Sequence, residues 1–562
     1  MKTSLLAGAL VATLFAASAQ AGTITPVNLD PPNQGLNDTA PRAPEGGNPG
    51  KTVGEQRRIV YQFAADLWGS VLNSKVETRV GASFQPLACT ATGATLGSAG
   101  PFWIWNSPDF PIPGAWYHQA LANSLAGVNL MAGDPAYVAP NDIEINSRFN
   151  ANLGGSNPDG TPCLTGSGWY YGLDGVTPPG KISFLDVVMH EIGHGLGFSG
   201  FVGYSSGVLG ERVGTPGVND VYTFSAFDNV KNLRFTDAGM ANADRAAAMR
   251  TPGRTSWDGA GVKASVPSVL TTPLILLQAT GTLNANYQFY GTASFGPAAT
   301  SANFGGEVAL ANDGVGDTAD ACEALPAGSL SGKVAFVNRG TCGFEFKTVN
   351  AQNAGATAVI IGNVASSGSP ATAPGMADDP TLSAGIPALS LNLADANAFR
   401  TALPGISVVL GTVPGRVAGA DAGGRALLYT PATVAGGSTF SHFDTSLTPN
   451  ALMEPAINDS LAANALVDLT VDLFADEGWR IDARNARISG CDTGVKLYTS
   501  GGLIAGANVQ AWNQLCHTNT NGKNGYQSCM SAYAASAQAA GLLLDNQADQ
   551  VMACVTKAKL PK

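Results

Sequence analysis

Apolar and polar residues alternate along this chain with the periods of both helices and strands. Residues 54–73 and 116–128 have the apolar spacing of amphipathic helices, whereas residues 76–84 alternate like a strand. Residues 142–150 show a second strand pattern, which we expect to form an edge strand. An Ala/Leu/Val-rich run at 460–477 predicts a further helix, which Gly478 would end. The mixture predicts an α+β fold.

The stretch that begins at Ser183 predicts another helix and contains the most informative motif. Ser183 and Asp186 have the spacing of a capping box, and an apolar face follows. The chain then reads His190-Glu191-Ile-Gly-His194, an H-E-x-x-H pattern in a protein with only 5 histidines. Residues four apart share one helix face, so His190 and His194 could bind one metal ion. Glu191 would lie where a carboxylate can take a proton from a metal-bound water. Two histidines at this spacing can also be ordinary core residues, but their scarcity here makes accident a poor explanation.

A third metal ligand is needed, because a catalytic zinc usually has three protein ligands and a water. The extended pattern H-E-x-x-H-x-x-G-x-x-H would place a histidine at position 200, which is Gly200. Gly197 does occupy the place of the glycine that ends the helix. Glu211 is the nearest carboxylate, but glycine and proline surround it, and no helix should form there.

Residues 436–455 offer a better candidate. They contain Ser-His-Phe-Asp around His442 and Leu-Met-Glu-Pro around Met453. Together with the helix motif, these pieces resemble the leishmanolysin-like metzincins, zinc peptidases in which a long insertion precedes the third histidine and a Met-turn follows it. The resemblance implies that His442 is the third ligand and that Met453 lies under the metal. If His442 is only a loop residue, Asp444 or Glu454 becomes the next candidate.

The region between the two halves of this motif has a pattern of its own. Val334–Val337 and Ala358–Ile361 read as short buried strands, and a helix-patterned segment between them ends at Gly355. Residues 339–347 read Arg-Gly-Thr-Cys-Gly-Phe-Glu-Phe-Lys. This stretch resembles the protease-associated (PA) domain, whose signature is R-G-x-C-x-F-x-x-K. We expect a PA domain over residues 268–416, inserted with its ends close together.

The N-terminus has a Met-Lys start, an apolar run at 5–17 and Ala-Gln-Ala at 19–21, the pattern of a cleavable signal peptide. His118 is expected to be an ordinary helix residue. The predicted organisation is a signal peptide (1–21), a flexible N-terminal segment (22–52), the first part of a peptidase domain (53–267), the PA insertion (268–416), the second part of the peptidase domain (417–486) and a Cys-containing C-terminal region (487–562).

The cysteines follow this division. All 8 lie after the signal peptide, which suggests disulfides in an exported protein. We expect Cys89–Cys163 and Cys322–Cys342, whereas the last four cysteines allow three connectivities. These four are Cys491, Cys516, Cys529 and Cys554.

Charge and composition limit the possible partners. A net charge of −11 argues against nucleic acid or an anionic membrane. No run of eighteen apolar residues follows the signal peptide, so no membrane span is expected. The acidic stretch Asp313–Asp320 could bind calcium, but it lacks the glutamate of an EF-hand, and a solvated loop is the preferred interpretation.

These features predict a secreted, monomeric zinc endopeptidase that acts on proteins or peptides. His190, His194 and His442 would bind Zn²⁺, Glu191 would be the general base, and an extended substrate could pair with the strand at 142–150. The alternative is a catalytically inactive secreted binding protein that uses the PA domain as its interaction surface. A zinc hydrolase with a different substrate is less favoured, because PA insertions are typical of peptidases.

Overall fold

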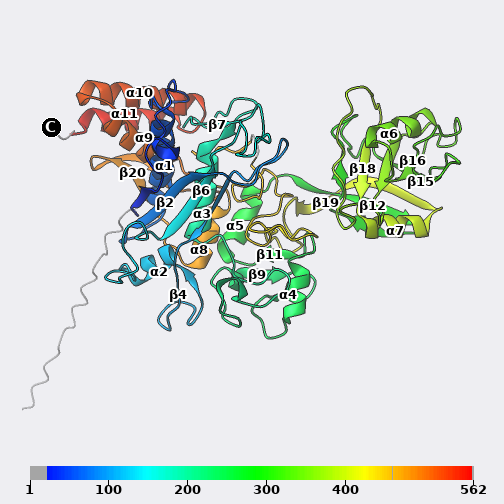
Figure 1. Ribbon diagram of the computed structural model, residues 1–562, viewed down its shortest axis with the longest axis horizontal. Coiled ribbons are helices and arrows are strands. Elements are labelled where there is room, and N and C mark those ends of the chain that lie inside the picture. Colours follow the sequence, from blue (N-terminus) through cyan, green and yellow to red (C-terminus); the bar gives the residue numbers. More distant parts are fainter. Residues whose placement is uncertain (1–21, 458–459, 560–562) are drawn as a thin grey trace, which may run out of the picture.

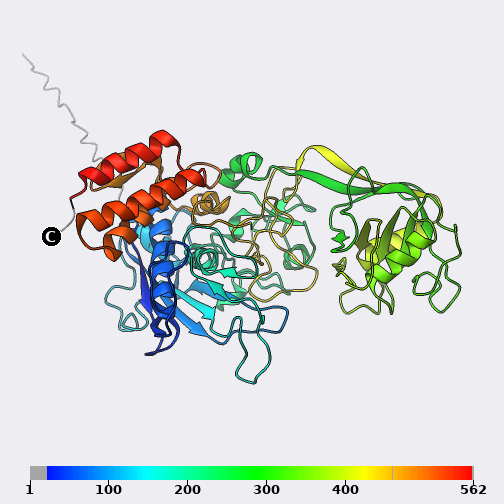
Figure 2. The same cartoon turned by 90° about the horizontal axis from the view of Figure 1, so that it is seen from above.

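The chain forms a large α+β body and a smaller domain beside it (Figure 1). The computed structural model describes residues 22–457 and 460–559, so the predicted signal peptide lies outside the described residues. Figures 1 and 2 both show the smaller domain at one end of the body, joined to it by the two long strands β12 (Pro273–Gly281) and β19 (Ile406–Val417). No helix in the described part of the chain is long and apolar enough to cross a membrane.

A four-stranded sheet organises the body, in the order β1-β2-β6-β3. The first three strands run parallel, and β3 pairs with β6 in the antiparallel direction. The prediction of an edge strand at 142–150 is therefore wrong, because β6 lies inside the sheet and β3 forms its edge. Strand β3 reads Gly-Ser-Ala-Gly-Pro and lacks the β-branched and aromatic residues that mark strands, so its sequence gives little signal. The four strands are β1 (Ile24–Asn28), β2 (Thr78–Gln85), β3 (Gly97–Pro101) and β6 (Ile145–Asn150).

The segment 22–52, expected to be flexible, is anchored to the body. Strand β1 pairs with β2 along its length. Asn48 is fully buried, and its Nδ2 donates to the carbonyl oxygens of Gln56 and Tyr171. The composition of the segment misled the prediction, because Gly, Pro and Asn do not prevent order where a neighbouring strand and side chains satisfy the backbone.

Two helices pack beneath the sheet, α1 (Val53–Val71) and α3 (Phe184–Leu196). Helix α3 begins as predicted, with Ser183 accepting a hydrogen bond from the Asp186 backbone N–H. The capping box is only half formed, because the Asp186 carboxylate accepts instead from the backbone N–H of Ala463. Helix α3 is thereby tied to a segment that follows the insertion.

Two predicted helices are shorter than expected. Helix α2 covers only Gln119–Ala126, because the preceding Tyr117–His118 forms β5, which pairs with β4 (Ile104–Trp105). Helix α8 covers only Thr470–Glu477, since Asp468 adopts a positive φ of 41° before it. The end of α8 is confirmed, with Gly478 at φ 113°.

The smaller domain has an eight-stranded sheet whose centre is parallel, in the order β13-β12-β19-β15-β16-β17-β18-β14. The predicted strand–helix–strand unit is confirmed as β16 (Val334–Asn338), α6 (Phe344–Asn353) and β17 (Ala358–Gly362). Alternate side chains of β16 enter two cores, one under α6 and one under α7 (Leu393–Ala402), so helices cover both faces. The remaining strands are β13 (Ala285–Tyr287), β14 (Gly291–Thr292), β15 (Gly305–Leu310) and β18 (Ala388–Leu391).

The two strands at the ends of the smaller domain pair with each other. Pro273 of β12 lies directly opposite Val417 of β19 in the antiparallel ladder. The boundary predicted at 268 falls within α5 (Ala260–Val269), which packs on α8 and accommodates Pro267 near its end. The lower part of the body also contains β9 (Ala226–Asp228), β10 (Leu233–Arg234), α4 (Asn242–Ala248) and β11 (Thr255–Trp257), with β7 (Trp169–Tyr170) and β8 (Ile182–Ser183) pairing near α3.

The C-terminal region is a hairpin and three helices, and α9 packs along α1. Trp512 of α9 meets Phe63 of α1 edge to face, with ring centroids 5.7 Å apart. Two disulfides, Cys491–Cys554 and Cys516–Cys529, decide among the three connectivities, and Cys89–Cys163 and Cys322–Cys342 form as predicted. The elements are β20 (Asn485–Ile488), β21 (Cys491–Lys496), α9 (Ala505–Asn519), α10 (Gly522–Ala539) and α11 (Asp545–Lys557).

Candidate metal centre and active-site cleft

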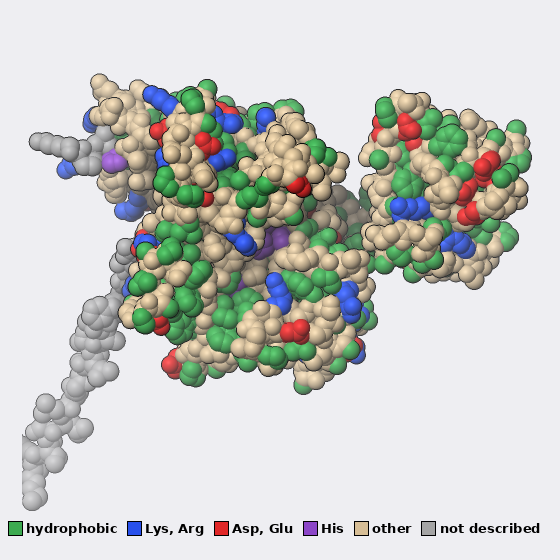
Figure 3. Space-filling view, in the orientation of Figure 1, with side chains coloured by type: hydrophobic (Ala, Val, Ile, Leu, Met, Phe, Trp, Pro, Cys, Tyr) green, Lys and Arg blue, Asp and Glu red, His purple; other side chains and the backbone are tan. Residues whose placement is uncertain are grey.

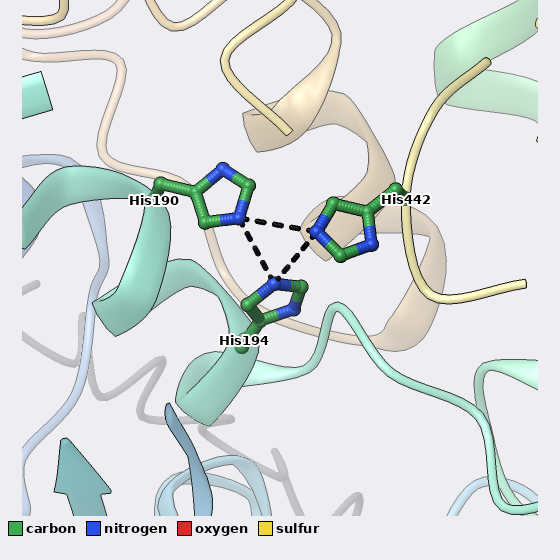
Figure 4. Close-up of side chains that lie close together, drawn as sticks. All are labelled: His190, His194 and His442. Carbon is green, nitrogen blue, oxygen red and sulfur yellow. Dashed lines mark hydrogen bonds between the residues drawn. The ribbon is translucent and has the colours of Figure 1, made fainter. Parts of the chain in front are cut away.

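Three histidines converge at the end of α3 (Figure 4). His190 and His194 project from one face of the helix, and His442 comes from the loop that follows the insertion. The Nε2 atoms of His190 and His194 are 3.0 Å apart. Each of them lies 3.2 Å from the Nε2 atom of His442. The fold thus brings together side chains that are 248 positions apart in the sequence.

The second ring nitrogen of each histidine, Nδ1, forms a hydrogen bond with a backbone carbonyl oxygen. A carbonyl oxygen only accepts, so each Nδ1 carries the proton and each Nε2 presents a lone pair. Burial lowers the pKa of His190 to about 4, that of His442 to about 3 and that of His194 well below its usual value, so the rings are neutral. The acceptors for His190, His194 and His442, in that order, are the carbonyl oxygens of Leu452 (2.7 Å), Phe198 (2.8 Å) and Ser438 (2.9 Å).

Three unprotonated nitrogens at this separation have no proton to share, and a cation between them would explain their convergence. Nitrogens bound to a tetrahedral zinc at its usual bond length would be about 3.3 Å apart, close to the observed spacing. The backbone carbonyls that hold Nδ1 are the partners that metal-binding histidines usually have. The cluster is therefore suited to hold a metal ion.

Glu191 lies beside this cluster against the edge strand. Its side chain is buried, and Oε2 has no hydrogen-bond partner within the described residues. Burial raises the pKa of Glu191 to about 8, against the opposing effects of the Ala99 N–H of β3 and the charge of Arg148. A nearby cation would favour the carboxylate form. Gly97 makes room for this side chain, since a Cβ there would lie 2.5 Å from Glu191 Oε1.

Met453 is fully buried under α3, where a Cβ on Gly193 would come within 2.9 Å of its sulfur. Its carbonyl oxygen accepts from Phe443 N–H at 2.9 Å, which joins the Met453 turn to the loop of His442. Neither alternative ligand enters the histidine cluster: Asp444 binds Ser446, and Glu454 accepts from a backbone N–H of its own turn. The exposed Glu211 also lies outside the cluster.

Two residues near the site escaped the sequence analysis. Asp468 accepts a hydrogen bond of 2.5 Å from the N–H of Leu452, whose carbonyl holds His190. His118, predicted to be an ordinary helix residue, precedes α2 and is fully buried, with Nε2 2.7 Å from Ser199 Oγ. Burial lowers the pKa of His118 to about 3. No motif marks either residue, because their partners are distant in the sequence.

The histidines and Glu191 line a cavity of about 830 Å³. Figure 3 shows histidine side chains within a hollow on the front of the body. Strand β3 lines the cavity along its whole length, and so does the stretch just before it. The other lining residues come from helix α3, the segment that follows it, the His442 loop and the Met453 turn, with Leu164 and Ile182 in addition. Apolar members are Leu164, Ile182, Val187, Leu452 and Ile457, and polar members include Ser199, Arg212, Ser438 and Ser441.

The acidic stretch considered for calcium lies in the smaller domain. Asp313, Asp320 and Glu323 can bring their oxygens within 4.8 Å of one another. Lys347 is buried nearby and donates to the Asp320 carbonyl oxygen at 2.6 Å. This ammonium already supplies positive charge, so the solvated-loop interpretation stays.

Comparison with protein families matches residues 297–399 to the PA domain, which places a PA domain within the smaller domain. Comparison with curated proteins gives no match. Among solved structures, the chain is similar to the zinc aminopeptidase BSAP of Bacillus subtilis, with 18% identity over 28% of this chain and 37% of that one, at a TM-score of 0.19.

Two further solved structures give similar values. The aminopeptidase of Aneurinibacillus sp. strain AM-1 is 16% identical over 27% of this chain and 37% of its own, at a TM-score of 0.18. The subtilisin-like protease Apa1 of Pseudoalteromonas sp. AS-11 is 18% identical over 26% and 34%, at a TM-score of 0.19. The likeness thus spans less than two fifths of each of these proteins, and it carries no argument about function.

Proposed function

We propose that this protein is a secreted zinc endopeptidase of the leishmanolysin-like metzincin type. The observation that carries the proposal is the arrangement of His190, His194 and His442, whose neutral Nε2 atoms converge beside the buried carboxyl of Glu191. An open site with three histidine ligands and an adjacent carboxylate suits hydrolysis by water.

Bound zinc would polarise the scissile carbonyl and lower the pKa of the attacking water. Glu191 would accept the proton from that water and pass it to the leaving amine. Its unpartnered Oε2 faces no competing donor among the described residues, so it is free for this role. The carbonyl partners of Nδ1 keep the imidazoles in one orientation and one tautomer during the reaction.

Strand β3 gives the cleft a way to hold an extended peptide. It is the last strand of its sheet, so its outer edge has no strand partner there. A substrate backbone could pair with this edge, directly above Glu191. This assigns to β3 the role that the sequence suggested for residues 142–150.

The principal rival is a catalytically inactive binding protein. Digestion of casein by the purified protein, with and without a zinc chelator, separates the two. The proposal requires chelator-sensitive cleavage that returns when zinc is added back. Intact casein in the presence of a stoichiometrically zinc-loaded protein would favour the rival.

A further inference from the structure

One wall of the cleft presents an arginine that is held in place but has no anionic partner. Arg212 lines the cavity, its backbone N–H donates to the Phe201 carbonyl at 3.1 Å, and its Nη1 donates to the Gly200 carbonyl at 2.7 Å. The guanidinium carbon lies 4.4 Å from the centre of the Tyr204 ring. The hydrogen bond to Gly200 and the contact with the ring therefore orient the side chain, while the backbone hydrogen bond to Phe201 holds the turn that carries it.

Arg212 forms no direct ion pair in the described part of the chain. No carboxylate lies within ion-pair distance of it in the described ranges, and no other Lys or Arg lines the cavity there. The nearby Asp220 is fully buried and accepts from Phe201 N–H and Thr223. The Nε and Nη2 groups of Arg212 thus keep their donors for a ligand.

A second donor lines the same cavity. Ser199 also lines the cavity, and its Oγ is 2.7 Å from His118 Nε2. His118 is fully buried, and its Nδ1 has no partner among the described residues. A buried N–H without a partner is rarer than a bare acceptor, so Nε2 carries the proton and donates to Ser199. The Ser199 hydroxyl then has its own hydrogen free to donate into the cavity.

We propose that Ser199 and Arg212 form a carboxylate-binding subsite of the cleft, which selects substrates with an acidic side chain or a free C-terminal carboxylate close to the cleaved bond. Gly200 connects the two residues, because it follows Ser199 in the sequence and its carbonyl oxygen accepts the hydrogen bond from Arg212 Nη1. Both offer donors and one carries positive charge, which fits a carboxylate rather than an amide or an ammonium group. The inference rests on the proposed peptidase function.

The test uses peptide pairs that differ only by Glu or Gln at one position, each with a free or an amidated C-terminus. We expect kcat/KM to be about tenfold higher for a carboxylate at the preferred position, as charge-assisted hydrogen bonds allow. If the subsite binds the C-terminal carboxylate, amidation of the peptide should abolish the preference. If it binds the side chain, the preference for Glu over Gln should survive amidation. Arg212→Gln should bring the Glu-to-Gln ratio close to one, and Arg212→Glu should reverse it in favour of a Lys peptide.

Arg250→Gln is the matched control, because Arg250 is also exposed, also donates to one backbone carbonyl and lies away from the cleft. It should keep the ratio of the unmodified protein. Ser199→Ala should lower the ratio by less than Arg212→Gln, since it removes a neutral donor.

Binding of the same peptides to the Glu191→Ala variant, measured by calorimetry, separates this inference from the peptidase proposal. If the carboxylate peptide binds more tightly but the unmodified protein cleaves neither peptide, the peptidase proposal is wrong and the subsite is supported. Chelator-sensitive cleavage with equal binding of both peptides, and no reversal in Arg212→Glu, would overturn the subsite alone.

Discussion

At the scale of single residues, the centre combines three neutral histidines with one carboxyl group of raised pKa. The histidines are held by the backbone, whereas Glu191 has one oxygen without a partner. In the proposed function, metal binding and proton transfer fall to different side chains, so substitutions should separate the two effects.

Replacing Glu191 by alanine should remove the base and leave every ligand. Zinc content should stay near one per chain, while casein hydrolysis falls by roughly 10²–10⁴-fold. Metal analysis beside an activity assay checks both parts. Near-normal turnover in the folded variant would remove Glu191 from its role.

Replacing His442 by alanine should instead remove a ligand. We expect zinc content well below one per chain and loss of activity, because two histidines alone make a weaker site. His517→Ala is the control, since that histidine is exposed on α9. If His442→Ala keeps its full zinc content and activity, His442 is not the third ligand, and Asp444 or Glu454 becomes the next candidate.

The pKa of His118 also predicts how stability depends on pH. Because its pKa is about 3 in the folded protein and near 6.5 when unfolded, the unfolded chain binds more protons between these values. The free energy of unfolding should therefore rise with pH across pH 3–6.5, with a contribution of a few kcal/mol from this residue. His118→Gln keeps a donor for Ser199 and should flatten the slope measured by denaturant unfolding. An unchanged slope would contradict the lowered pKa of His118 in the folded protein.

At the scale of elements, α3 and strand β3 lie on two sides of Glu191. Helix α3 could be predicted, because an apolar face, a capping serine and a histidine pair are all local signals. Strand β3 could not, since Gly-Ser-Ala-Gly-Pro is ordered by pairing with β6. The hydrogen bond from Leu452 to Asp468 and the contact of His118 with Ser199 arise only from tertiary structure, so the sequence could not predict them. His442 was predicted as a ligand only through the family resemblance.

The glycine pattern of β3 gives a prediction. In Gly97→Ala the added Cβ would lie 2.5 Å from Glu191 Oε1, so it should displace the proposed base. We expect a large loss of kcat with zinc retained. Gly100→Ala is the control on the same strand, because a Cβ there meets nothing within 4 Å, and its effect should be much smaller. Equal effects would show that strand conformation, not the contact with Glu191, matters.

At the scale of the whole molecule, the PA-containing domain stands apart from helix α3, which carries His190 and His194 (Figure 1). None of its residues between β12 and β19 lines the cavity that contains the three histidines and Glu191. We therefore expect it to act in docking or access of large substrates rather than in bond cleavage.

Replacing the insertion by a short linker tests this expectation. Because Pro273 and Val417 lie opposite each other, two or three residues could close the gap. Zinc binding should survive, and activity on a short peptide should fall much less than activity on a folded protein. Equal loss of both, in a variant with native circular dichroism, would assign the insertion a part in building the active site.

The paired ends of the insertion also bear on the order of events during biosynthesis. His190 and His194 emerge from the ribosome long before His442, with the entire PA-containing domain between them. A chain interrupted anywhere in this interval has two of the three histidines and lacks the turn of Met453 that holds His190 through Leu452. Such a fragment has no complete metal centre. The insertion therefore delays assembly of the three-histidine cluster until the chain has passed His442 and Met453, so a shorter fragment lacks the chemistry that the proposed function requires.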